Sequence, residues 1–185
     1  MLDEVLSDAK RRMERSVEAT RHEFATVRTG RASTSLLDRI QVDAYGSKMP
    51  LNQLATLSAP EARLLSITPF DTSMLKEIER AIQESDLGLN PSNDGRVIRL
   101  PIPQLTEERR REFVKVVRAL AEEGKIAVRN VRRDALHQLK EAEREGDSGS
   151  DDTRRGEDRV QKLTDEQIAA IENAAKTKEA EILEV

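Results

Sequence analysis

The sequence predicts an α+β protein, an elongated three-helix bundle with a small β/α/β domain inserted after the first helix. In three long stretches, apolar residues recur at alternating steps of three and four, which is typical of amphipathic helices. Between the first two stretches lie short alternating runs broken by turn-forming residues, which are typical of strands. Of the 185 residues, 36% are charged and 2% aromatic, a balance that favours long solvated helices over a thick globular core.

The first helix is expected to start near residue 2. Seven of the eight residues at positions 2, 6, 9, 13, 17, 20, 24 and 27 are apolar, and these positions share one helical face. The pattern stops at Thr29-Gly30, and glycine is common just past the end of a helix. We therefore expect a helix of about 28 residues.

Residues 30–105 are expected to form the inserted domain. Strand-like runs occur at 40–44, 64–67 and 97–100, and the last follows the turn signal Asn93-Asp94-Gly95. Asp71 is suited to cap a short helix with one apolar face, formed by Met74, Leu75, Ile78 and Ile82. These runs and this helix predict a small β/α/β unit.

The second helix is expected over 106–145 and the third after a loop at 146–152. The second stripe runs through 114, 117, 121, 124, 128, 131, 135, 139 and 142, and Thr106 is a suitable N-cap. The third stripe is weaker and runs through 160, 163, 168, 171, 175, 182 and 185. Since no single amphipathic helix buries its own stripe, residues 1–29 and 106–185 are expected to form one bundle.

This order requires the chain to leave the bundle near residue 30 and return near 105. We expect hinges near 30–33 and 101–105. The hinge residues predicted are Gly30, Ser33, Pro101 and Pro103. Proline stiffens a crossing strand, whereas glycine admits backbone torsions that other residues avoid.

Several function classes are excluded or disfavoured. The absence of Cys excludes disulfides and thiolate chemistry, and two His residues do not make a multi-His metal site. No phosphate-binding loop, dinucleotide fingerprint, nucleophile elbow or zinc-protease motif occurs. No apolar run approaches the length of a membrane span, and the N-terminus lacks a signal-peptide core. We expect a cytoplasmic protein that is not an enzyme and has no cofactor, metal or membrane partner.

The positive signal is a row of cations on the second helix. Net charge is −4, yet residues 106–139 hold nine basic and six acidic side chains. Six of seven residues at helical spacing are cationic, about 100° round from the apolar stripe: Arg111, Lys115, Arg118, Lys125, Arg129 and Arg132, with Glu122 as the exception. Arg28 has the same offset on the first helix, and Arg31 follows it in the hinge.

Such a row suits a phosphate backbone, and the scarcity of aromatics favours structured RNA held by backbone and shape over base stacking. An ordinary solvated helix face explains the row equally well. A third interpretation is a non-catalytic helical adaptor whose charged faces pair with partner helices.

Four segments resemble one family: VRTGRAS at 27–33, DLGLNPSNDGRVIRLPIPQLTEERRREFVK at 86–115, VRNVRRDA at 128–135 and QKLTDE at 161–166. They are similar to the bacterial ribosome recycling factors, and the resemblance covers essentially the whole chain. It implies a three-helix bundle carrying an inserted β/α/β domain, the two forming an L shaped like transfer RNA. Thr34 departs from the family, which often has proline there.

The resemblance also implies a function. Such a factor binds the post-termination ribosome along large-subunit ribosomal RNA, and elongation factor G then uses GTP to split the subunits. The RNA-contacting positions that it implies are Arg28, Arg31, Arg129, Arg132 and Arg133, and Gly30 matches in the hinge. We expect the factor to act as a monomer.

Overall fold

A computed structural model describes residues 1–184, and position 185 of the third apolar stripe lies outside the described residues. The chain divides into two compact units, residues 1–27 with 108–185 and residues 28–107. Three long helices form the first unit and small antiparallel sheets with one helix form the second. The predicted mixed fold, long helices with a small sheet domain, is confirmed.

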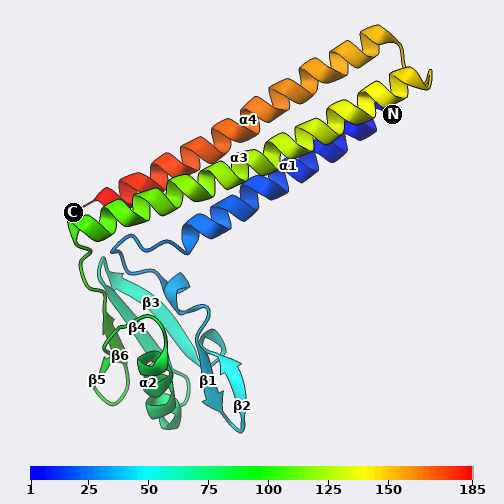
Figure 1. Cartoon of the computed structure of the whole chain (residues 1–185). Helices are drawn as coiled ribbons and strands as arrows, with labels where there is room; N and C mark the ends of the chain where they lie inside the picture. Colours follow the sequence, from blue (N-terminus) through cyan, green and yellow to red (C-terminus); the bar gives the residue numbers. More distant parts are fainter. Residues whose placement is uncertain (185) are drawn as a thin grey trace. The chain divides into compact units, whose positions relative to one another are not determined.

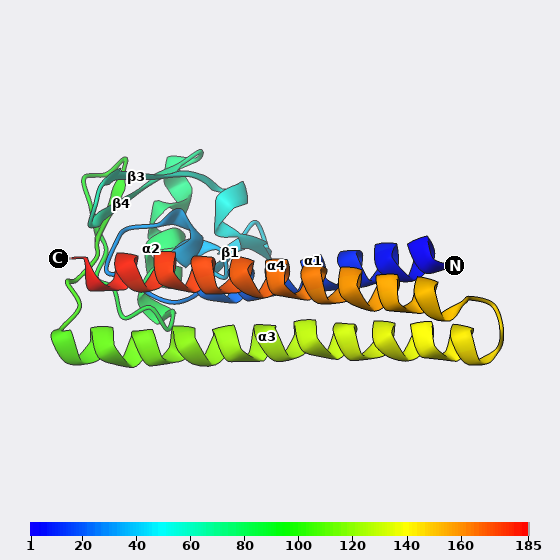
Figure 2. The ribbon, with the colours of Figure 1, turned by 90° about the horizontal axis from the view of Figure 1, so that it is seen from above.

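The bundle consists of α1 (Leu2–Ala25), α3 (Glu107–Arg144) and α4 (Ser150–Leu183), which lie side by side in both ribbon views (Figures 1 and 2). Leu2 of α1 lies against Gly156 near the start of α4, so these two helices run in the same direction. Along α3 and α4, Arg118 pairs with Glu179 and Lys125 with Glu172, so these two run in opposite directions.

The predicted stripes form the bundle core. All positions of the first stripe after Leu2 are buried, and so are all positions of the second stripe after Val114. The third stripe is buried at Val160, Ile171, Ala175 and Ile182. One apolar cluster joins residues of all three helices, so each stripe is covered by the other two helices.

Two glycines mark the closest approaches between the helices. A Cβ added at Gly124 of α3 would lie 3.1 Å from the Cβ of Thr20 on α1 and still closer to its hydroxyl oxygen. A Cβ at Gly156 of α4 would lie 2.6 Å from a methyl of Leu2 and 3.0 Å from one of Leu139. Glycine is disfavoured inside helices, so its presence at these two positions is explained by the lack of room for a side chain and not by helix propensity.

Two expected helix ends were wrong. α1 ends at Ala25 rather than near residue 29, because the Thr26 hydroxyl and amide both donate to the Glu23 carbonyl and close the last turn. Val27 is nevertheless buried, which is why the apolar pattern continues past the helix. α4 begins at Ser150 inside the expected loop, since Gly149 is extended and two acidic residues in the first turn favour the helix start.

The second unit contains six strands. β1 (Gln41–Ala44) and β2 (Ser47–Pro50) form a hairpin, and Tyr45 and Gly46 both have positive φ in its two-residue turn. The second sheet has the order β3-β4-β6-β5, with every pair antiparallel. Its strands are β3 (Ala55–Glu61), β4 (Leu64–Pro69), β5 (Ser92–Asn93) and β6 (Ile98–Pro101).

Helix α2 (Leu75–Glu84) packs on this unit through its apolar face, with Ile78 and Ile82 fully buried. Asp71 accepts a hydrogen bond from the Ser73 amide, but it caps a short 3₁₀ turn (Thr72–Met74) that precedes α2. Strand β3 was not predicted. It lies at the sheet edge, where most of its residues are exposed and Pro60 is tolerated, so it lacks an apolar alternation.

We predict that Gly124→Ala lowers the free energy of unfolding. Alanine favours a helix by about 1 kcal/mol over glycine, but overpacking a buried contact costs about 1–3 kcal/mol. The buried, β-branched Thr20 has little freedom to move away, so we expect a net loss of about 1 kcal/mol in urea denaturation.

The double variant Thr20→Ala/Gly124→Ala is expected to recover part of this loss, because it removes the clashing atoms. Asn130→Ala, an exposed site on the same helix, controls for helix propensity alone. A Gly124→Ala protein as stable as the wild type would contradict the role of this contact.

Candidate nucleic-acid interface

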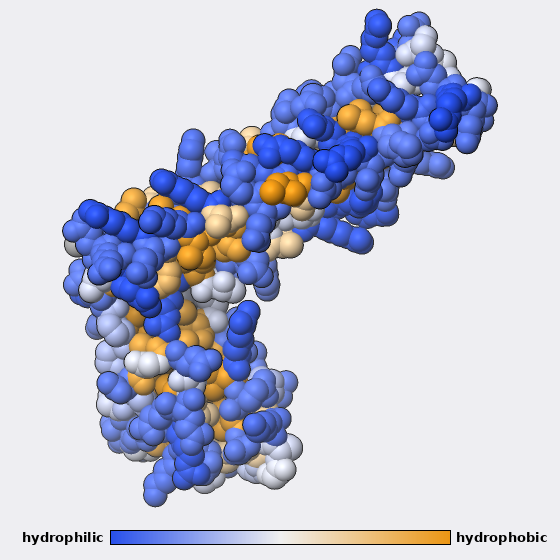
Figure 3. Space-filling model, in the orientation of Figure 1, coloured by the Kyte–Doolittle hydropathy of each residue, from blue (hydrophilic) through white to orange (hydrophobic). Residues whose placement is uncertain are grey.

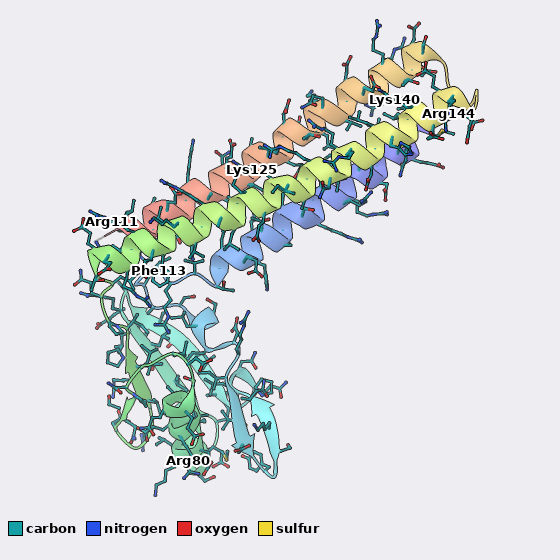
Figure 4. The ribbon with its side chains drawn as sticks, in the orientation of Figure 1. Arg80, Arg111, Phe113, Lys125, Lys140 and Arg144 are labelled. Carbon is teal, nitrogen blue, oxygen red and sulfur yellow. The ribbon has the colours of Figure 1, made fainter. Side chains whose placement is uncertain are left out.

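The row of cations predicted on the second helix lies along α3, and three of its six members contact α4. We call Arg111, Lys115, Arg118, Lys125, Arg129 and Arg132 the cationic row. Lys125 and Arg132 are partly buried, whereas the other four are exposed. Figure 4 labels Arg111 near the start of α3 and Lys125 further along it. The row therefore contains cations in two different environments.

Three members of the row bind residues of α4. The Arg118 Nε lies 2.9 Å from Glu179 Oε1, and the Lys125 Nζ lies 3.2 Å from Glu172 Oε1. Arg132 Nη1 donates to Gln161 Oε1 at 3.2 Å. These three cations are spaced seven residues apart, as are facing residues of antiparallel helices. We call these three pairs the α3–α4 ladder.

Lys125 is the most enclosed member of the ladder. Its side chain is 16% exposed, and its ammonium also lies 3.3 Å from Glu122 Oε1 on the same helix. Burial alone would lower the pKa of Lys125, but hydrogen bonds to Glu172 and Glu122 outweigh burial and raise this pKa above its ordinary value. The ammonium is therefore charged and already neutralised by two carboxylates.

Arg132 is held less completely. Its Nη1 bonds to Gln161, whose amide nitrogen donates in turn to Asp165 at 2.9 Å. Its Nε is buried and has no hydrogen-bond partner among the described residues. A buried donor without a partner is costly, so the Nε of Arg132 is an unsatisfied donor inside the bundle and is not accessible to an external anion.

A second group of cations is exposed. Lys115, Arg129 and Arg133 are exposed and have no hydrogen bond or ion pair to any residue from 1 to 184. Arg133 follows Arg132 on α3 and lies one position outside the row. Hydrophilic side chains cover most of the bundle face seen in Figure 3, with small apolar patches between them. These three cations are available to an external anion.

Arg28, which was expected on the first helix, lies beyond the end of α1, and it belongs with Arg31 to the second unit. Arg28 is partly buried, and its Nη2 donates to the Leu87 carbonyl at 2.8 Å. Arg31 is exposed, and its amide donates to the Thr29 hydroxyl at 3.3 Å. Arg28 is thus held by a backbone carbonyl within the second unit.

The four predicted hinge residues differ in how firmly they are held. Gly30 has φ of +77°, and a Cβ there would meet the Leu105 side chain at 3.4 Å. Ser33 caps a 3₁₀ turn and accepts from the Ser35 amide, whereas Pro101 pairs in β6. Pro103 is exposed in the irregular segment that follows.

Both crossing segments are also tied to the β3–β4 turn. The Ala32 amide donates to the Ala62 carbonyl at 2.7 Å, and the Ile102 amide donates to the Arg63 carbonyl at 2.8 Å. These backbone bonds fix residues 32 and 102 within the second unit. No sequence signal indicates them, because backbone carbonyls are the same at every position.

Sequence reasoning also missed the acidic side of the ladder. Glu172 and Glu179, the two acidic partners in the ladder, lie seven residues apart on α4, and this spacing was a signal for interhelical partners. The third partner, Gln161, does not follow this spacing. Within residues 1–184 no helix is both long and apolar enough to cross a membrane. The same residues contain no group of three or more acidic, His or Cys side chains placed to hold a metal.

The fold defines a class of two-unit proteins in which a three-helix bundle carries an inserted antiparallel sheet domain. Within that class, residues 20–183 match the family model described as ribosome recycling factor. The chain belongs to the ribosome recycling factor family, as the resemblance predicted, and is therefore a translation factor.

Proteins of this family match the chain over all or nearly all of its length. The ribosome-recycling factor of Rubrobacter xylanophilus is 60% identical over 97% of both chains, and that of Chloroflexus aurantiacus is 54% identical over all of both. A solution structure of the ribosome recycling factor matches with a TM-score of 0.78 at 42% identity, covering 100% of this chain and 98% of the other.

A second solved structure describes the T. thermophilus ribosome recycling factor and the E. coli elongation factor G bound to the E. coli post-termination complex. Its chain matches with a TM-score of 0.68 and 47% identity over the full length of both chains.

We predict that Lys125→Met lowers the free energy of unfolding by about 0.5–1 kcal/mol, because it removes the ammonium from two carboxylates. A double-mutant cycle with Glu172→Gln, followed by urea denaturation, measures the coupling between the two side chains. Since folding raises the pKa of Lys125, the stabilisation is complete below the ordinary value of 10.5 and is lost as pH rises through the raised pKa.

The coupling is therefore expected to stay constant between about pH 6 and 9 and to decrease at high salt. Zero coupling at low salt and neutral pH would show that the ladder does not stabilise the bundle at this position.

Proposed function

We propose that this chain binds the post-termination ribosome and, together with elongation factor G and GTP, separates it into subunits for reuse. Membership of the ribosome recycling factor family over residues 20–183 is the observation that carries this proposal. It is supported by the similar structure in which a recycling factor and elongation factor G are bound to a post-termination complex. GTP hydrolysis belongs to elongation factor G, and this chain acts as a non-catalytic partner in the cytoplasm.

The bundle binds large-subunit ribosomal RNA through α3. Three exposed cations without an internal partner, Lys115, Arg129 and Arg133, make the first phosphate contacts. Arg132 is partly exposed and joins them, although its Nη1 already donates to Gln161. Arg28, Arg31, Arg111 and Arg118 extend the surface, whereas Lys125 contributes mainly through the ladder because both adjacent carboxylates already bind it.

The chain acts as a monomer. Its three apolar stripes are covered within one bundle, so no stripe is left for a second copy. The six exposed large apolar side chains among the described residues are scattered over both units: Met1, Tyr45, Phe70, Val116, Ile126 and Leu183. Single exposed apolar residues of this kind do not form a dimer interface.

We predict that the purified chain converts post-termination polysomes into subunits only when elongation factor G and GTP are both present. The measurement is a sucrose-gradient profile with each component left out in turn. Splitting by the chain alone, or no splitting with all components, would contradict the proposed function.

We predict that Arg129→Gln weakens binding to isolated large subunits and lowers the slope of log affinity against log salt by about 1, because one phosphate contact is lost. Helical circular dichroism is expected to stay unchanged. Arg11→Gln removes one exposed cation from α1 and serves as the matched control. Arg118→Gln is expected to have a smaller effect than Arg129→Gln, since Glu179 already holds that guanidinium.

The same binding assay separates this proposal from a protein-binding adaptor. Binding through RNA phosphates is lost when the subunits are treated with nuclease, whereas binding to a protein partner survives. If the slope of log affinity against log salt is the same for Arg129→Gln as for the wild type, Arg129 is not part of the RNA-contacting surface.

A further inference from the structure

A groove runs between the C-terminal parts of α1 and α4, away from the cationic row of α3. It has a volume of about 640 Å³. Phe24 and Ala25 line it from α1, and Ala170 and Ala174 line it from α4. The remaining lining side chains are polar or charged, and they are Arg21, Asn173, Thr177, Lys178 and Glu181. The groove therefore combines an apolar part with two cations and one carboxylate.

Lys178 differs from the other enclosed lysine of the bundle. Lys125 is partly buried between two carboxylates, and these raise its pKa. Lys178 is also partly buried, but it has no hydrogen bond or ion pair within residues 1–184. Burial lowers the pKa of Lys178, and the nearby Glu181 carboxylate offsets this only in part. The fraction of Lys178 that carries an uncharged amine near neutral pH is therefore higher than that of an exposed lysine.

Arg21 supplies a second element of the groove. Its side chain is 52% exposed, and its only ion pair among the described residues is a long one, 3.9 Å to Glu18. A guanidinium binds phosphate with two parallel hydrogen bonds and stays charged at every relevant pH. The groove thus places an anion-binding group and an amine around one apolar surface.

We propose that this groove is a modification site, in which Lys178 is the nucleophile and small acyl phosphates are the acyl donors. Arg21 binds the phosphate group of the donor, and the acyl chain lies on the apolar lining near Phe24. This inference does not depend on the ribosome or on the proposed function.

The reaction balances without a further reactant. The Lys178 ammonium first releases a proton to solvent, and the nitrogen lone pair then attacks the acyl carbon. The bond between that carbon and the bridging oxygen breaks, and phosphate leaves with the bonding pair. After the nitrogen loses its second proton, the products are an amide on Lys178 and inorganic phosphate.

The charged groups at the groove set the pH dependence. Burial disfavours the ammonium form of Lys178, and Glu181 on α4 favours it. Because burial dominates, labelling of Lys178 is expected to reach its maximum at lower pH than labelling of exposed lysines.

The test incubates the full chain with acetyl phosphate between pH 7 and 9 and measures the initial rate at each lysine by quantitative mass spectrometry. Lys178 is expected to react severalfold faster than Lys176, an exposed lysine on the same helix. Lys125, which is held by two carboxylates, is expected to be the slowest. A rate at Lys178 no higher than at Lys176 would overturn the proposal.

The role of Arg21 is tested with two reagents. Arg21→Gln is expected to slow Lys178 labelling severalfold with acetyl phosphate, but much less with the uncharged N-hydroxysuccinimidyl acetate. The ratio of the two rates cancels any change in the amine itself. An unchanged ratio overturns the assignment of acyl phosphates to the groove. Lys178→Arg, which keeps a cation in the groove, is expected to remove the fast-reacting site.

Discussion

Mutual burial of three apolar stripes is the constraint on which the rest of this structure depends. α1 is separated from α3 by the whole inserted unit, yet its stripe is covered only when α3 and α4 pack against it. Gly124 and Gly156 let neighbouring side chains approach where any Cβ would collide. The inserted unit can therefore separate two helices of the bundle in the sequence without contributing residues to the bundle core.

The same packing sorts the cations of α3. Arg118, Lys125 and Arg132 contact residues of α4, and Lys125 is enclosed by two carboxylates. Arg129 and Arg133 are exposed and have no internal side-chain partner among the described residues. The cations of α3 therefore fall into two groups, those held by residues of α4 and those without an internal partner among the described residues.

At Lys178, burial without an ion-pair partner lowers the pKa, whereas at Lys125 two carboxylates raise it. Both Lys125 and Lys178 lose contact with water, but only Lys125 gains carboxylates close enough to hold its charge. The difference arises from what each neighbouring helix presents, since α4 presents acids to α3 while α1 presents Arg21 and Phe24 to the groove.

Most of the helices and their buried faces were predictable from the sequence, because helical periodicity depends only on residues three and four apart. Strand β3 was not, because an edge strand that buries few of its residues has no alternation to detect. The ends of α1 and α4 were misjudged, since apolar patterning continues through Val27 and the capping at Gly149 depends on backbone conformation.

For the candidate site, residue order determines that six cations share one face of α3, and this follows from spacing alone. The tertiary structure decides which of these cations are held by a side chain of another helix. Arg118, Lys125 and Arg132 find their partners 29 to 61 residues away along the chain. Their state depends on how two helices are aligned, and that alignment is established by the core rather than by any local pattern.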